Sequence, residues 1–186
     1  MSTTINKAAL EQESGLLVDF VNTRDIEEET DSIADPRGLQ VWIRERTGEY
    51  VDAPDEEALD RLLVLRESLR ALLRANNGEE IEAGELAPLQ GAAERSRFRT
   101  TFAADGHLGI APARSDISGF EARLLLAIER LQSQGAWPRL KACTDDECQW
   151  AFYDATRNHS RTWCSMEVCG NREKTRRYRE RKGTGS

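Results

Sequence analysis

Residues 143–172 read CTDDECQWAFYDATRNHSRTWCSMEVCGNR and decide how the last third of this chain folds. All four cysteines of the 186-residue sequence lie in this stretch, as two close pairs separated by 15 residues. Two pairs at about this separation are typical of a zinc site with four cysteine ligands. Four thiolates complete the tetrahedral coordination of zinc and leave no position for a substrate, so we expect one structural zinc ion. The predicted ligands are Cys143, Cys148, Cys164 and Cys169.

A metal would also explain how so short a segment folds. Residues 139–182 are near the size of about 40 residues below which domains usually need metals or other cross-links. Zinc binding would therefore supply much of the folding free energy. Cysteines without a metal, an iron–sulfur cluster, or His159 in place of one cysteine remain alternatives. His159 has no second histidine at ligand spacing, which favours an exposed side chain, and His107 is predicted to be an ordinary surface residue.

The segment after the last cysteine is strongly basic, since seven of the thirteen residues from 170 to 182 are Lys or Arg. A helix with so little apolar surface gains little by packing on a core. The planar guanidinium of arginine suits phosphate oxygens and guanine edges, so a zinc-anchored helix of this kind predicts binding to DNA. The predicted nucleic-acid contacts are Arg157, Arg161, Arg172, Lys174, Arg176, Arg177, Arg179 and Arg181.

Two other roles for the basic helix remain open. It is either a solvated helix in which Glu173 and Glu180 form local ion pairs, or a binding element for an acidic protein surface. The charge distribution favours nucleic acid, because residues 1–136 carry a net charge of −11 and residues 137–186 carry +4. An acidic body with a basic tail is expected when only the tail meets a polyanion.

Apolar periodicity and helix-end signals predict that the first 136 residues are mainly helical. The expected helices are one that ends near residue 22 and four that cover about 36–48, 55–76, 83–94 and 119–134. Residues 98–104 and 107–113 flank Asp105-Gly106, which predicts a β-hairpin with a type I′ turn. The acidic stretch 25–35 predicts a loop.

The expected fold class is therefore α+β with two domains. Residues 1–136 form a mainly helical domain with one β-hairpin. Residues 137–182 form a small four-cysteine zinc finger, in which a hairpin is followed by a helix, as in a treble clef; the gap between the cysteine pairs has room for a short hairpin. Residues 183–186, GTGS, are expected to be a flexible tail.

Polar residues follow the first apolar segment. Asp19, Asn22 and Arg24, together with Thr23, are candidates for a pocket that holds a small-molecule effector. Alternatively, Asp19 and Asn22 bond to neighbouring backbone. We find no Ser–His–Asp set, glycine-rich phosphate loop, HExxH motif or paired catalytic carboxylates, so we do not expect an enzyme.

Residues 152–172 closely resemble the CGNR zinc finger, which is named for the sequence that stands here at 169–172. The resemblance extends over about residues 139–182. Residues 17–23, LVDFVNT, and the expected helix at 39–48 look like the ABATE domain that usually precedes this finger. That domain is described as a stress-induced transcription regulator.

The resemblance implies a bacterial regulator whose finger binds DNA, with the four cysteines as zinc ligands and Arg172 and the following arginines as contacts. The N-terminal domain would then sense an effector or assemble the protein. No apolar run approaches the roughly 20 residues that span a membrane, and the N-terminus, MSTTINKAALEQESG, shows no secretory signal. We therefore expect a cytoplasmic protein without a membrane partner, whose oligomeric state the sequence leaves open.

Overall fold

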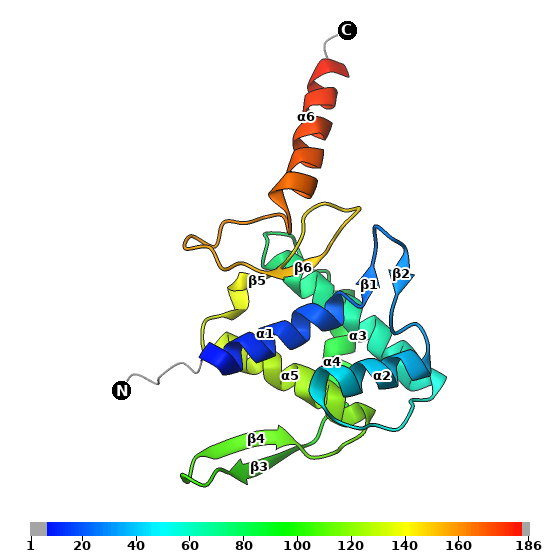
Figure 1. Ribbon diagram of the computed structural model, residues 1–186, viewed down its shortest axis with the longest axis vertical. Coiled ribbons are helices and arrows are strands. Elements are labelled where there is room, and N and C mark those ends of the chain that lie inside the picture. The colour runs from blue at the N-terminus through cyan, green and yellow to red at the C-terminus, as the bar shows by residue number, and fades with distance from the viewer. Residues whose placement is uncertain (1–6, 184–186) are drawn as a thin grey trace.

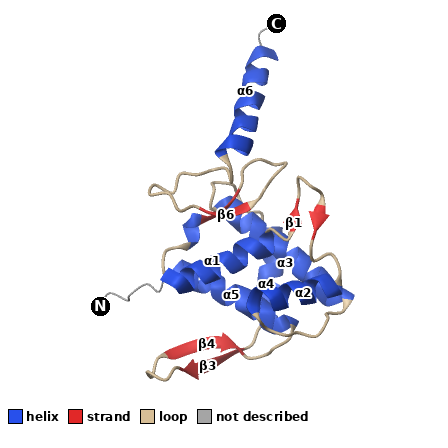
Figure 2. Ribbon diagram, in the orientation of Figure 1, coloured by secondary structure: helices blue, strands red, loops and turns tan. Residues whose placement is uncertain are grey.

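The computed structural model describes residues 7–183. Apart from Gly183, the predicted flexible tail lies outside these residues. The described chain confirms the α+β fold class, with a body of helices, short antiparallel strand pairs and a final helix that projects from the body (Figures 1 and 2). The helices of the body are α1 (Lys7–Val21), α2 (Pro36–Thr47), α3 (Glu56–Ala75), α4 (Ala83–Arg95) and α5 (Ile117–Ser133).

The helix boundaries follow from local capping. The Asp35 carboxylate accepts a hydrogen bond from the amide of Gly38 at 2.9 Å, next to Pro36 in the first turn of α2. Asp55 and Asp116 cap α3 and α5 in the same way. A side-chain acceptor at this position satisfies an amide that has no partner within the helix. The predicted helices are therefore confirmed, with ends shifted by one or two residues.

One apolar core joins these helices. Phe20 of α1, Trp42 of α2 and Phe120 of α5 form an aromatic cluster with ring centroids 5.6–6.0 Å apart. Tilted and edge-on contacts of this kind add to the stability from burial alone. Helix α3 contributes a stripe of almost fully buried leucines to the same core: Leu59, Leu62, Leu65, Leu69 and Leu73.

Two predictions for the N-terminal part need correction. The hairpin of β3 (Phe98–Phe102) and β4 (Leu108–Pro112) is present, but its turn is not type I′. The amide of Gly106 donates to the carbonyl of Ala103 at 2.9 Å, so the central residues of the turn are Ala104 and Asp105. Neither has the positive φ that a type I′ turn needs at both central residues, and only Gly106, which follows them, has it, with φ 81°. The predicted loop after α1 contains a second short ladder, β1 (Arg24–Asp25) with β2 (Thr30–Asp31).

The C-terminal segment starts with a 3₁₀ turn and a strand pair and ends in helix α6. The predicted hairpin followed by a helix is present, but the hairpin does not lie in the gap between the cysteine pairs, because strand β5 (Leu140–Ala142) precedes the first pair and β6 (Ala151–Tyr153) follows it. The first cysteine pair therefore lies in the turn of this hairpin. The remaining elements are the 3₁₀ turn η1 (Trp137–Arg139), the π-helical turn η2 (Met166–Gly170) and α6 (Asn171–Gly183).

The apolar core runs across the predicted domain boundary at residues 136 and 137. Leu140, Ala142 and Ala151 are buried in the same cluster as the leucines of α3. The strand pair β5–β6 thus packs directly on the helical body, whereas α6 extends away from it (Figure 1). The division into two domains stays a prediction.

Candidate metal centre and basic helix

The four cysteine sulfurs converge on one point. All four Sγ atoms lie within 4.8 Å of one another. The Sγ atom of Cys164 is 3.5 Å from that of Cys148 and 3.7 Å from that of Cys169. Zinc–sulfur bonds of about 2.3 Å in a tetrahedron place the sulfurs about 3.8 Å apart, so the cluster has the dimensions of a zinc site. This confirms the predicted ligand type, one zinc ion held by four cysteines.

Backbone hydrogen bonds form the two turns that carry the sulfurs. The amide of Cys143 donates to the carbonyl of Trp150 at 2.9 Å, which extends the β5–β6 ladder to the first ligand. The amide of Cys148 then donates to the carbonyl of Asp145 at 2.9 Å and closes the first turn. In the second turn, the Ser165 hydroxyl accepts from the amide of Val168 at 3.3 Å. The chain therefore directs the cysteines toward the centre through its own backbone geometry.

The electrostatics of the cluster favour a cation. Cys143 has a lowered pKa because the Cys148 and Cys164 thiols donate hydrogen bonds to its sulfur. Cys143 and Cys148 in turn raise the pKa of Cys164, and burial and the neighbouring sulfurs raise the pKa of Cys169 to about 12. Ionisation of one sulfur therefore disfavours ionisation of its neighbours, because adjacent thiolates repel. A dication removes this penalty and allows all four sulfurs to bind as thiolates.

A buried ion pair supports the loop between the cysteine pairs. The Lys141 ammonium lies 3.3 Å from the Asp154 carboxylate, and both side chains are almost fully buried. The same ammonium donates to the carbonyls of His159 and Arg161 at 2.6 and 2.9 Å. Burial raises the pKa of Asp154, but hydrogen bonds from Thr156, the Arg161 amide and Lys141 outweigh it and lower that pKa to about 2. His159 thus supplies its carbonyl here, and its exposed ring lies outside the metal cluster.

Arg172, the first arginine of α6, holds the helix to the rest of the protein. Its guanidinium contacts Glu27 of the β1–β2 turn at 2.5 Å. It also lies 3.1 Å from Asp145 and 3.6 Å from Glu147, which belong to the turn between the first two cysteines. The hydrogen bond to Glu27 is the main cause of the raised pKa of Arg172. Three carboxylates therefore surround this cation and fix the direction in which α6 leaves the finger.

The rest of α6 is exposed. Every side chain from Lys174 to Lys182 is exposed to solvent. Glu173 pairs with Arg176 and Arg177 at 2.5 and 2.6 Å, one turn away on the same helix. Such exposed pairs contribute only about 0.3–0.5 kcal/mol each, so they do not prevent the arginines from binding an anion.

The two predicted contacts outside α6 differ in position. Arg161 lies over the ring of Phe152, 4.8 Å from its centroid, and donates to the carbonyls of Trp163 and Cys164. It therefore supports the second cysteine turn. Arg157 is exposed in the loop before it. The structure places six of the eight predicted contacts on α6 and leaves Arg157 and Arg161 apart from them; all eight phosphate contacts stay predictions.

The residues proposed for an effector pocket each make their own contacts, and the pocket stays a prediction. Asp19 forms an ion pair with Arg46 at 2.6 Å, and Arg24 lies 3.7 Å from Glu67. Asn22 bonds in both directions to the backbone of Ala151 in β6, at 2.8 and 2.9 Å. A cavity of about 570 Å³ lies elsewhere, between α1 and the finger, and its apolar lining includes Leu10, Val18 and Tyr153.

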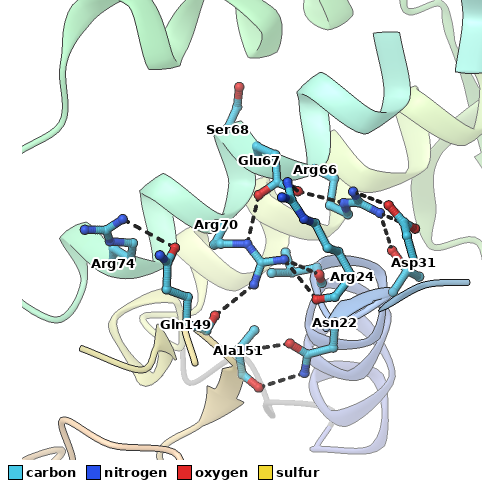
Figure 3. A network of polar contacts seen from close by, with 12 residues as sticks. Asn22, Arg24, Asp31, Arg66, Glu67, Ser68, Arg70, Arg74, Gln149 and Ala151 are labelled. Atoms are coloured by element: carbon cyan, nitrogen blue, oxygen red, sulfur yellow. Dashed lines mark hydrogen bonds and ion pairs between the residues drawn. The ribbon is translucent and has the colours of Figure 1, made fainter. Parts of the chain in front are cut away.

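A buried polar network joins the body to the finger (Figure 3). Arg70 of α3 donates to the carbonyls of Val21, Arg24 and Gln149, and its Nε bonds to Glu67 at 3.0 Å. Burial lowers the pKa of Arg70, and Glu67 opposes this shift. Sequence reasoning missed this role, because an arginine inside a leucine-rich helix gives no sign of partners almost 80 positions away.

The same network includes a second buried arginine on α3, and the residues after that helix add separate bonds to the finger. Arg66 forms two hydrogen bonds with Asp31, at 2.7 and 2.8 Å, and so fixes the β1–β2 ladder that carries Glu27. The Asn76 side chain donates to the carbonyls of Trp137 and Leu140, and Asn77 donates to those of Ala142 and Thr162. The C-terminal end of α3 therefore holds the finger through hydrogen bonds to its backbone.

The contacts of Asn22 give a test of its role. Asn22→Ala should lower the free energy of unfolding of the zinc-loaded chain by about 2–3 kcal/mol, because it leaves buried backbone groups of Ala151 without partners. Asp19→Ala is the matched control and should cost less than about 1 kcal/mol, since its ion pair is exposed. Urea unfolding measures both. Equal losses would contradict the assignment of Asn22 as a docking residue.

Four converging sulfurs at the base of an exposed basic helix define a zinc-finger protein, here with the finger packed on a helical body. Family comparison agrees. Residues 139–182 match the CGNR zinc finger, and residues 14–140 match the ABATE family, whose printed description is "Putative stress-induced transcription regulator". The chain therefore belongs to the ABATE family and ends in a CGNR zinc finger.

These comparisons set the general class of the protein, a zinc-binding member of a regulator family. Neither family is described as a family of enzymes. Comparison with curated proteins found no match. Within residues 7–183, no helix is long and apolar enough to cross a membrane.

Proposed function

We propose that this protein is a DNA-binding transcription regulator whose α6 helix contacts the DNA. The observation that carries the proposal is the exposure of a cation-rich helix that zinc and Arg172 hold in one direction. A free charged helix of thirteen residues would be marginal in water. Here its first turn continues from η2, which carries Cys169, so the cations are presented on a fixed support.

The position of α6 fits an approach to a polyanion. The acidic body carries −11, and α6 points away from it (Figure 1). Phosphate groups can therefore reach the helix without coming close to the carboxylates of the body. An α-helix is about 10–12 Å in diameter and fits the major groove of DNA, which is about 12 Å wide.

The two sides of α6 differ in electrostatic surroundings. The groove side, with Arg172, Arg176 and Arg179, faces Asp145 and Glu147 across a cavity of about 500 Å³. Those carboxylates pair with Arg172, and together with Glu173 and Glu180 in the same lining they make this side less favourable for phosphate. The opposite, outer side carries Lys174, Arg177 and Arg181, by the 100° spacing of residues on a helix. We therefore assign the main phosphate contacts to the outer side and a positioning role to Arg172.

A pair of matched double variants tests this assignment. Lys174→Gln with Arg177→Gln should weaken binding to duplex DNA about tenfold or more at low salt. It should also reduce the slope of log affinity against log salt by about 2, since two phosphate contacts are lost. Arg176→Gln with Arg179→Gln removes the same charge and one Glu173 pair from the groove side, and should weaken binding less. Fluorescence polarisation at several salt concentrations measures both.

The outcomes separate the function from the choice of side. Equal losses in the two double variants would overturn the outer-side assignment and leave DNA binding standing. A zinc-loaded wild-type chain that shows no salt-dependent binding would contradict the function itself. Such a chain would fit the second candidate function, a finger that binds an acidic protein surface. The ion pair between Arg172 and Glu27 is a contact of this kind within the chain itself.

The role of the helical body is part of the same proposal. The family description supports a role in a stress response. Four cysteines that bind zinc and form no disulfides fit the reducing cytoplasm of a bacterium. An effector that binds in the cavity between α1 and the finger would contact both parts of the chain, including Arg139 and Tyr153 of the finger. The volume of this cavity lies within the range of small-molecule sites, about 300–1,000 Å³.

A further inference from the structure

The hairpin β3–β4 has one face made entirely of uncharged residues. The ladder pairs Phe98 with Pro112, and each following pair is set by the same register. In an antiparallel ladder, residues directly opposite each other share a face, and so do alternate residues along a strand. The residues of this apolar face are Phe98, Thr100, Phe102, Leu108, Ile110 and Pro112.

Four large side chains of the apolar face are exposed. Phe102 is 74% exposed, Leu108 57%, Ile110 50% and Phe98 45%. Isolated exposed apolar residues are normal, but a contiguous patch of several such side chains marks an interaction site. Together they leave about 300–500 Å² of apolar surface in contact with water. This is roughly half of the 800 Å² that each partner contributes to a standard protein interface.

The body does not use the apolar face to hold the hairpin. The other face of the ladder, with Thr101, Gly109 and Ala111, is half-buried, and β4 lies against α5. Arg130 of α5 donates to the carbonyl of Ile110 at 2.9 Å. A two-stranded ribbon is marginally stable by itself. The hairpin is therefore attached to α5 while its apolar face remains open.

We propose that this apolar face binds the same face of a second copy of the chain. In a two-fold symmetric dimer a surface meets itself, so any charge near the axis is placed beside an identical charge. The apolar face carries no charged residue, which removes that repulsion and also gives no attraction for a charged partner. Its contiguous apolar surface gains most from an equally apolar surface, and the chain supplies one on every copy.

The location of the hairpin would leave the basic helix α6 accessible in both copies of such a dimer. The hairpin lies at the opposite end of the molecule from α6 (Figure 1). Pairing through the apolar face would therefore leave both α6 helices exposed. Two basic helices on one particle bind a polyanion with two sites more tightly than either does alone. The proposal itself concerns association and does not depend on what α6 binds.

Sedimentation velocity of the zinc-loaded full chain over a range of concentrations tests the proposal. We expect the average mass to rise from one chain toward two, with a dissociation constant of about 1–100 µM. Phe102→Glu places a carboxylate at the most exposed position of the apolar face in each copy and should weaken association at least tenfold. Leu108→Glu, on the opposite strand of the same face, should do the same.

Val64→Glu is the matched control, because Val64 is 53% exposed on α3, outside the hairpin. It introduces the same charge at an exposed apolar position and should leave association unchanged. Zinc content and circular dichroism should be unchanged in all variants, since the replaced side chains are exposed. A wild-type chain that stays monomeric at every concentration would overturn the proposal. So would dimers that persist in both hairpin variants.

Discussion

Cys164→Ser is expected to reduce the zinc content from one ion per chain to almost none and to unfold the segment 139–182. The four sulfurs lie within 4.8 Å of one another, so three thiolates and a hydroxyl cannot reproduce the closed tetrahedral site. Zinc binding in small fingers is worth about 10–16 kcal/mol at neutral pH, and it is inseparable from folding. Metal analysis by mass spectrometry and limited proteolysis measure the two losses.

The effect should extend to the helical body. Leu140, Ala142 and Ala151 belong to the same apolar core as α3, so an unfolded finger exposes part of that core. We therefore expect a lower unfolding temperature for the whole chain, together with loss of any DNA binding.

His159→Asn is the control for Cys164→Ser. His159 has φ 49°, a backbone conformation that asparagine tolerates, and its exposed ring lies outside the metal cluster. This variant should therefore keep one zinc and the wild-type unfolding temperature. If Cys164→Ser kept its zinc, or His159→Asn lost it, the assignment of the ligands would be wrong.

Arg70→Ala should have the second-largest effect, a loss of about 3–5 kcal/mol from the free energy of unfolding. The Arg70 side chain is 3% exposed, and its removal takes one donor from Glu67 and one from each of three backbone carbonyls. One of those carbonyls belongs to Gln149, directly after a zinc ligand. The finger should therefore also become more sensitive to proteolysis, although its cysteines are intact.

Two further variants isolate the reason for that loss. Arg24→Ala removes an exposed partner of Glu67 in the same network and should cost less than about 1 kcal/mol. Arg70→Lys keeps the charge but cannot reach several carbonyls from one planar group, so it should recover only part of the stability. If Arg70→Ala cost no more than Arg24→Ala in chemical denaturation, the network would not be what joins the finger to the body.

The local signals of the sequence predicted each helix and the metal site. Asp35 and Asp55 cap helices within three residues of themselves, and such short-range bonds can be read directly from spacing. The cysteine pairs were equally informative, because the coordination chemistry of zinc restricts both the number and the type of its ligands. The acidic body and basic end also follow from composition alone.

Other expectations failed where a distant partner or a backbone angle decided the result. The hairpin of the finger forms around the first cysteine pair because β5 precedes Cys143 and pairs with β6 beyond Cys148. The stretch between the pairs instead folds around Lys141 and Asp154. Burial decides this arrangement, since a buried ammonium and carboxylate must find each other and satisfy nearby carbonyls.

By itself, therefore, the sequence determined the helices, the four sulfur ligands and the basic character of α6. Only the tertiary structure decided that Asn22, Arg70 and Asn77 join the finger to the body, and that carboxylates surround Arg172 on one side of α6. The reason is physical. Capping and metal coordination use short segments of chain, whereas a buried polar side chain bonds to whichever backbone group packing brings within reach, here up to 129 positions away.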